Sequence, residues 1–471
     1  MVIKQLLNTF FAIFLQKYRL RIVFLLYNKV ELKKRIQKML VNFRFKNFRS
    51  FYKETVLSME ATKDKELREI NTFSIKDKLL GKGENELLKS AVIFGGNASG
   101  KSNVFKAFAY MKNVVLLSAS QFPIVQNVEP FLFYSDSQLE NSLFEVEIIQ
   151  NNTFYKYGFQ IKNGIVEKEW LDKRKERLTH VFIREDSYIA ISGLSRQASK
   201  LINIADGTLF LSIGKNFHLD ITPELDNVME WFQNLLIVFE NNANSLDIYT
   251  LNNGKYKEQA LKILELADIG IKNIKVVKDK VANMADINDV LKFNSQLQTN
   301  PFEIGQLKKE ESNLYNIDMV TSFDVLNKKN NKPISKKDVL LFKNRGFNSE
   351  GTMRLLCYLG WILAALDQGR IIIIDEIDAK LHFLVADYLL KLFNSIDKNP
   401  KNAQLISTAH NVMLMDESLR RDQIYFTSKD KVGESTLVSL SDFSNVRKND
   451  LFSKKYLAGF YSDLPDMTKE L

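Results

Sequence analysis

Two glycines, a lysine and a serine occur at a spacing that suits phosphate binding. Residues 95–102 read GGNASGKS, which fits the pattern G-x-x-x-x-G-K-[ST]. A glycine-rich turn lets backbone N–H groups converge on an anion, and the first turn of a following helix adds the positive end of its dipole. Lys101 would then reach the β- and γ-phosphates of a nucleotide, and the Ser102 hydroxyl would ligate Mg²⁺.

The segments on either side supply the two elements that this pattern requires. Residues 90–94 read SAVIF, a short apolar run typical of a buried strand. Residues 103–115 have helical spacing of apolar side chains and contain no Gly or Pro. A chance glycine-rich turn before a helix is the alternative, and the strand that precedes the loop argues against it.

A second apolar run carries the carboxylates that a nucleotide site needs. Residues 370–378 read RIIIIDEID, and four consecutive isoleucines are typical of a strand buried on both faces. The strand ends in Asp375 and Glu376, and open α/β sheets bind ligands at the carboxyl ends of their strands. We expect Asp375 to hold Mg²⁺ through water and Glu376 to orient or deprotonate the attacking water. Taken alone, the run could equally be a buried strand that ends in solvated acids.

Two further segments would place polar groups near the same site. Residues 403–410 read AQLISTAH, a strand that would bring His410 to the same sheet edge, although a histidine at a strand end is often structural. Residues 348–352 read NSEGT and open an apolar helix over 353–366. Its first turn, with Ser349 and Gly351, is either an ordinary N-cap or a second anion site. One nucleotide does not need two such helix ends unless the second serves another subunit.

These motifs follow one another in the order of ABC-type ATPase heads, which the chain resembles. More closely, it resembles the RecF/SMC-like bacterial AAA-family ATPases of the abortive-infection and OLD-like group. The stretches that carry this likeness are LVNFRFKNFRSF (40–51), NSEGTMRLL (348–356), DEIDAKLH (375–382), LRRDQIYF (419–426) and KKYLAGFYSDLP (454–465). The resemblance implies an α/β fold of the P-loop NTPase, ABC-type class: a mixed and parallel sheet flanked by helices, an antiparallel β lobe and a mainly helical insertion.

The resemblance also implies ATP and Mg²⁺ as cofactors and gives roles to the matching residues. Glu376 would be the catalytic base, His410 would contact the γ-phosphate, and Asp375 would support the metal. Ser349 and Gly351 would act across a homodimer on the ATP of the partner. The residues expected around ATP within the chain are Gly95, Asn97, Ala98, Ser99, Gly100, Lys101 and Ser102, with Arg49 approaching the nucleotide.

Two positions depart from the ABC pattern. NSEGT stands where many ABC proteins have LSGGQ, so Glu350 places an extra acid near phosphate. The glutamine that senses Mg²⁺ in ABC heads is not assigned, since Gln121 and Gln126 both lie in the right interval.

The net charge of +10 is concentrated at the N-terminus. Residues 1–38 hold nine Lys and Arg and one Glu, which leaves +2 for the remaining residues, so global charge says almost nothing about nucleic acid. The longest charge-free run in this extension, 5–16, is far short of the ~20 residues that span a bilayer. We therefore expect no stable membrane insertion. The extension is interpreted as an upstream over-read or an appendage before a natural start at Met39, with a basic membrane-surface helix as the alternative.

The rest of the chain divides into three parts. Residues 39–189 are predicted to form an ATPase lobe with strands at 143–149, 153–161 and 164–170. Residues 190–320 are predicted to be the mainly helical insertion, with helices over 225–239 and 256–267, and residues 321–471 return to the ATPase core. The basic cluster at 171–180 is interpreted as a solvated hairpin edge, with nucleic-acid contact as the alternative.

These observations favour a cytoplasmic, ATP-driven switch in bacterial anti-phage defence that dimerises on ATP. The single cysteine, Cys357, fits a reducing compartment. We expect a separate effector, because the segment after His410 is too short for a Toprim nuclease domain and no HNH, PD-(D/E)xK or zinc pattern occurs. The alternatives are a RecF-like DNA repair or chromosome-maintenance ATPase that clamps DNA and, least favoured, a transporter ATPase subunit.

Overall fold

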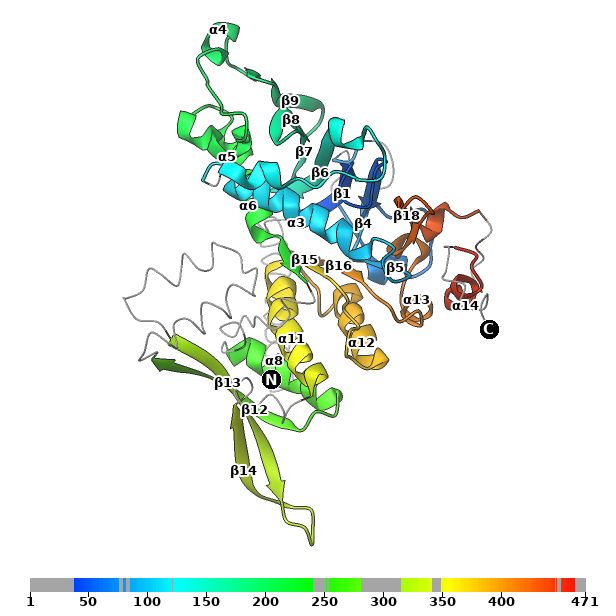
Figure 1. Ribbon diagram of the computed structural model, residues 1–471. Coiled ribbons are helices and arrows are strands. Elements are labelled where there is room, and N and C mark those ends of the chain that lie inside the picture. Colours follow the sequence, from blue (N-terminus) through cyan, green and yellow to red (C-terminus); the bar gives the residue numbers. More distant parts are fainter. Residues whose placement is uncertain are drawn as a thin grey trace, which may run out of the picture. The chain divides into compact units, whose positions relative to one another are not determined.

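Two large sheets carry most of the strands in the computed structural model (Figure 1). The structure describes residues 38–75, 79–81, 85–120, 122–239, 251, 254–280, 315–340, 349–444, 446 and 450–461. The predicted N-terminal extension lies outside these residues, except for Lys38. This residue opens β1, where it pairs with Gln150 and its ammonium lies 3.1 Å from Glu230 Oε1, so the predicted boundary after residue 38 falls within a strand.

The six-stranded sheet has the order β11-β15-β16-β5-β17-β18. All neighbouring strands run parallel except the last pair, β17 and β18. The strand of the predicted histidine therefore lies between the strand of the phosphate loop and the acidic strand. The strands are β5 (Ser90–Gly95), β11 (Leu236–Val238), β15 (Ile371–Ile374), β16 (Gln404–Thr408), β17 (Ile424–Lys429) and β18 (Ser435–Ser439).

Helices cover both faces of this sheet, which is why its central strands β5, β15 and β16 are mainly apolar and fully buried. Alternate side chains of β5 enter different cores: Ile93 packs with α3 (Lys101–Leu117) and the β lobe. Phe94 packs instead with α11 (Glu350–Gln368) and α12 (Phe383–Asn394). Because successive strand residues point to opposite faces, a strand with two buried faces has no polar alternation.

The second sheet is the antiparallel β lobe, with the order β10-β9-β8-β7-β6-β1-β2. The three hairpin strands predicted here are confirmed as β6, β7 and β8, and the basic cluster at 171–180 forms the β8–β9 hairpin. Asn152, with φ 58°, and Asn163, with φ 51°, lie in the tight turns. The strands are β1 (Lys38–Lys46), β2 (Thr55–Ser58), β6 (Ser142–Gln150), β7 (Thr153–Lys162), β8 (Ile165–Arg174), β9 (Leu178–Glu185) and β10 (Tyr188–Ile191).

The described part of 190–320 combines helices with strands, so a mainly helical insertion is not confirmed. The helix predicted over 225–239 ends at Asn234, and that part of the prediction is wrong. The run Leu236–Val238 instead forms β11, because it pairs in parallel with Ile372–Ile374. The helices are α4 (Arg196–Ser199), α5 (Phe210–Ile213), α6 (Thr222–Asn234) and α8 (Gly254–Leu266), and a third sheet contains β12 (Ile271–Lys280), β13 (Tyr315–Leu326) and β14 (Pro333–Leu340).

The remaining elements are short. They are α2 (Arg68–Asn71), β3 (Thr72–Ser74), β4 (Glu86–Leu88), α13 (Leu414–Glu417), α14 (Phe452–Leu457) and the 3₁₀ helices Phe122–Asn127, Ser137–Leu139, Gly214–Phe217, Arg421–Gln423 and Leu440–Asp442. Among the described residues, no helix combines the length and the apolar character that a membrane span requires.

Candidate nucleotide site

The predicted phosphate loop connects β5 to α3, and two of its glycines are required by space and backbone conformation. A Cβ on Gly95 would lie 2.3 Å from Thr427 Oγ1 and 2.6 Å from the Thr427 carbonyl oxygen. Gly100 has φ 113°, and a Cβ there would lie 2.6 Å from Ser435 Oγ. The loop is therefore pressed against β17 and β18, which leaves no room for side chains at these positions.

Lys101, the first residue of α3, turns its side chain back over the loop. The residue is only 6% exposed, and its Nζ donates to the carbonyl oxygens of Gly95 at 2.8 Å and Gly96 at 3.1 Å. Burial lowers the pKa of its ammonium, against the opposing effect of the Glu376, Asp375 and Asp378 carboxylates. A cation is thus held between the loop and the acids that follow β15, two strands away from β5.

The other predicted loop residues divide between the apex and the base of the turn. Asn97 and Ala98 are exposed at the apex, where Ala98 has φ 60°. Ser99 is buried, and its hydroxyl lies 2.6 Å from that of Thr427. Ser102 is half-buried in the first turn of α3.

Asp375 and Glu376 are joined by a residue that the sequence analysis missed. Thr408, at the end of β16, donates from its hydroxyl to Asp375 Oδ1 at 2.7 Å. The Thr408 hydroxyl oxygen in turn accepts from the backbone N–H of Glu376 at 2.7 Å. Glu376 has φ 56°, a left-handed conformation that is uncommon outside glycine, so this clamp fixes an otherwise unfavourable turn. The sequence shows only a hydroxyl residue at the end of an apolar strand, two residues before the predicted histidine, which does not reveal its place between the two acids.

His410 lies beside Glu376, as the order of the strands requires. Its Nε2 is 3.3 Å from Glu376 Oε1. The backbone N–H groups of His410 and Asn411 donate to Asp378 Oδ2 at 2.9 and 2.6 Å. Asp378 was also missed, and it ties the turn after the acidic strand to the turn after the histidine strand.

The N-terminus of α11 is exposed and is held by local contacts. Ser349 caps the helix, accepting from the N–H of Thr352 at 3.1 Å. A Cβ on Gly351 would lie 2.4 Å from the carbonyl oxygen of Lys380. Glu350, the acid that departs from the ABC pattern, forms an ion pair: its Oε2 lies 2.5 Å from Lys380 Nζ. The first turn of α11 therefore packs on the turn that follows the acidic strand, and Asn348 lies outside the described residues.

Among the residues that the structure describes, the link from the Arg49 segment to the loop region is made by the neighbouring residue, Ser50. The Arg49 guanidinium pairs with Glu129 Oε1 at 2.6 Å. Ser50, the next residue, accepts from Asn103 Nδ2 in the first turn of α3 at 2.8 Å. Of the two glutamines left open, Gln126 packs against the β7–β8 turn, and Gln121 lies outside the described residues.

The donor set suits a magnesium nucleotide better than a metal held by protein alone. Within the described ranges, no group of three or more His, Cys, Asp and Glu side chains could hold a metal ion. Mg²⁺ in nucleotide sites takes only one or two protein oxygens besides phosphate and water. The Ser102 hydroxyl and the Asp375 carboxylate are the oxygens that fit this requirement.

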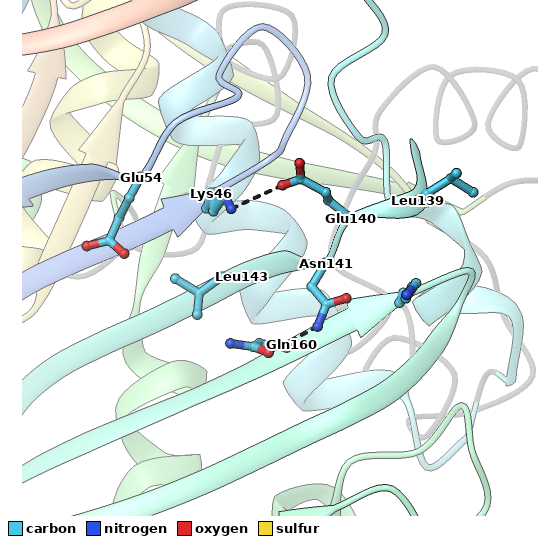
Figure 2. A pocket seen from close by; sticks show the side chains of 8 residues that line it. Lys46, Glu54, Leu139, Glu140, Asn141, Leu143 and Gln160 are labelled. Atoms are coloured by element: carbon cyan, nitrogen blue, oxygen red, sulfur yellow. Dashed lines mark hydrogen bonds and ion pairs between the residues drawn. The ribbon is translucent and has the colours of Figure 1, made fainter. Parts of the chain in front are cut away.

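A separate hollow of about 450 Å³ opens on the β lobe (Figure 2). Several of its polar groups are paired with one another: Lys46 Nζ donates to Glu140 Oε2 at 3.1 Å, and Asn141 Nδ2 donates to Gln160 Oε1 at 3.1 Å. It is lined by Lys46, Glu54, Leu139, Glu140, Asn141, Leu143, Gln160 and Lys162. None of the predicted nucleotide-site residues lines it, and we assign it no part in that site.

The parallel sheet, the loop between β5 and α3, and the acids on β15 define a P-loop nucleotide-binding protein. Residues 90–416 match the family described as "AAA domain, putative AbiEii toxin, Type IV TA system". The match covers more than half of the chain and includes the loop, both acids and His410, so the chain belongs to this AAA family of P-loop ATPases. A search of curated proteins found no match.

Proposed function

We propose that the chain is an ATP-hydrolysing switch that dimerises on ATP and acts in the cytoplasm with a separate effector in bacterial abortive-infection defence. One observation carries the ATPase part: Lys101 lies on the loop carbonyls, while Thr408 joins the two acids at the end of the neighbouring strands. The defence role is supported by the family description, which names a toxin and a type IV toxin–antitoxin system. We assign the chain to the ABC-type, RecF/SMC-like and OLD-like ATPase heads on the basis of the sequence motifs that these proteins share with it.

In this proposal each residue has one task at the bound nucleotide. Lys101 would exchange the Gly95 and Gly96 carbonyls for phosphate oxygens. Ser102 and Asp375 would hold Mg²⁺, which when bound would neutralise charge on the phosphates. Glu376 takes the proton of the attacking water. His410, 3.3 Å from that carboxylate, hydrogen-bonds the γ-phosphate.

In the proposed dimer, the second anion-binding helix N-terminus comes from the partner subunit. The exposed first turn of α11, with Ser349 and Gly351, would cover the γ-phosphate of a partner subunit, where helix N–H groups and the positive dipole end favour anions. Lys380 offsets the charge of Glu350 at that place. Two chains related by a two-fold axis would enclose two nucleotides in one interface.

The direct test is ATP hydrolysis by the purified full-length chain and its Glu376→Gln variant. The amide keeps the shape of the side chain but cannot accept the proton, so kcat should fall by ~10²–10⁴-fold while ATP still binds. Glu417→Gln, at an exposed glutamate at the end of α13, is the control and should keep the wild-type rate. Equal kcat for wild type and Glu376→Gln would remove the catalytic base from this proposal.

A further inference from the structure

A dense group of lysines lies on the hairpin formed by β13 and β14. Residues 324–337, here called the lysine hairpin, contain five lysines and a single acid, Asp324. The lysines are Lys328, Lys329, Lys332, Lys336 and Lys337. All five are exposed, and none forms an ion pair with another residue that the structure describes. Asp338, just beyond the hairpin, accepts a hydrogen bond from the Ser322 hydroxyl at 2.6 Å.

The basic β8–β9 hairpin uses its charges differently. Lys173 Nζ lies 2.5 Å from Glu224 Oε1, and the Arg174 guanidinium stacks 4.8 Å from the ring centre of Phe154. His180 Nδ1 lies 2.6 Å from Asp172 Oδ1. These groups serve internal packing. The lysine hairpin instead gathers five lysines against one acid, Asp324, which lies opposite Lys336 in the strand register. Such an excess of like charge costs stability unless a polyanion is bound.

The shape of the lysine hairpin restricts which class of polyanion it can bind. β12 pairs with β13 only as far as Phe323, so beyond that residue the hairpin is a two-stranded ribbon in which Leu326 is paired with Pro333. A two-stranded ribbon fits the major groove of B-DNA, about 12 Å wide, whereas the narrow major groove of A-form RNA excludes it. Leu326, 51% exposed, and Ile334, 65% exposed, add apolar side chains near the tip that can contact thymine methyl groups.

We propose that the lysine hairpin binds duplex DNA, with its lysines on phosphates and its apolar tip in the major groove. The third sheet connects this surface to the candidate nucleotide site. Ile274 of β12 and Met319 of β13 share an apolar core with Leu359 of α11, the helix that begins after Ser349. Binding itself does not depend on ATP hydrolysis, so the two proposals can fail separately.

Binding of a short fluorescein-labelled DNA duplex to the full-length chain, followed by anisotropy over a salt series, tests this proposal. Replacing Lys328, Lys329 and Lys332 by Gln should weaken binding about tenfold or more and reduce the slope of log K against log salt by about 2–3. Ile334→Ser should weaken binding without changing that slope. Unchanged ATP hydrolysis without DNA would show that these variants are folded.

Two double variants, each of which removes two positive charges, test whether the position of the charges matters and not only their number. Lys336→Gln with Lys337→Gln should weaken duplex binding, whereas Lys175→Gln with Arg177→Gln, on the exposed tip of the β8–β9 hairpin, should leave it within about twofold. The opposite ranking, or no duplex binding by the wild type, would overturn the proposal. Hairpin-dependent binding to phosphatidylserine vesicles without DNA binding would assign the surface to a membrane instead. Equal hairpin-dependent affinity for duplex RNA would overturn the groove assignment.

Discussion

The loop half and the helix half of the candidate site are held in contrasting ways. The loop is fixed by buried contacts from distant parts of the chain, among them Thr427 and Ser435 on β17 and β18. The first turn of α11 is held by its own cap and by Lys380, and Ser349 and Glu350 remain exposed. One half is thus preorganised for phosphate within the chain, and the other presents an open helix end, as a site completed by a second subunit requires.

This difference explains why the two halves should respond differently to substitution. Changes at the loop remove contacts that a nucleotide makes with its own chain. Substitutions at the N-terminus of α11 should leave nucleotide binding by the single chain intact and should affect only the contacts that a second chain makes with the nucleotide. Variants of the two halves therefore separate nucleotide binding from assembly.

The largest effect is expected at the loop, in Lys101→Ala. The ammonium is the counter-charge for the phosphates, and its loss should weaken ATP binding by roughly a hundredfold or more. Calorimetric titration with ATP measures this. Lys106→Ala, one turn further along α3 and half-buried, should bind like the wild type. Undiminished ATP affinity in Lys101→Ala would contradict the assignment of the loop.

A smaller effect is expected from Thr408→Val, which removes the hydroxyl between the acids at almost constant volume. Asp375 Oδ1 and the Glu376 N–H would each lose a partner, so kcat should fall about tenfold, the range of one or two misplaced hydrogen bonds. The Mg²⁺ concentration for half-maximal rate should rise, and ATP affinity measured without Mg²⁺ should stay unchanged.

Thr408→Ser keeps the hydroxyl and should restore most of the rate. A purely structural role for Thr408 would show itself as a lower melting temperature with unaltered Mg²⁺ dependence, and that result would dismiss the positioning role.

The parts of the site that could be predicted from the sequence are those whose chemistry is contiguous in the chain. GGNASGKS, IIIIDE and the strand ending in His410 each combine an apolar run with the polar group at its end, so strand direction alone places them at one edge. Thr408 and Asp378 act across two strands, and their roles depend on β15 and β16 being neighbours. Local patterns do not contain that information.

The same limit applies to the fold between the two ATPase segments. Leu236–Val238 continues the apolar spacing of α6, and only the free edge of β15 makes it a strand. In β12, which reads IKNIKVVKDK, lysines interrupt the apolar alternation. Residues 281–314 separate this strand from its partner β13, so the partner of β12 is not local in the sequence. Long-range pairing overrode local propensity in both cases.

The central claim, that ATP joins two chains through the exposed end of α11, is tested most directly by sedimentation velocity of the Glu376→Gln variant with and without ATP and Mg²⁺. The account predicts a monomer without ATP and a dimer with it at micromolar concentration. Adding Ser349→Arg should keep the protein monomeric while ATP binding by the single chain remains nearly intact. A Glu376→Gln protein that binds ATP but sediments as a monomer in both conditions, or a dimer unaffected by Ser349→Arg, would contradict it.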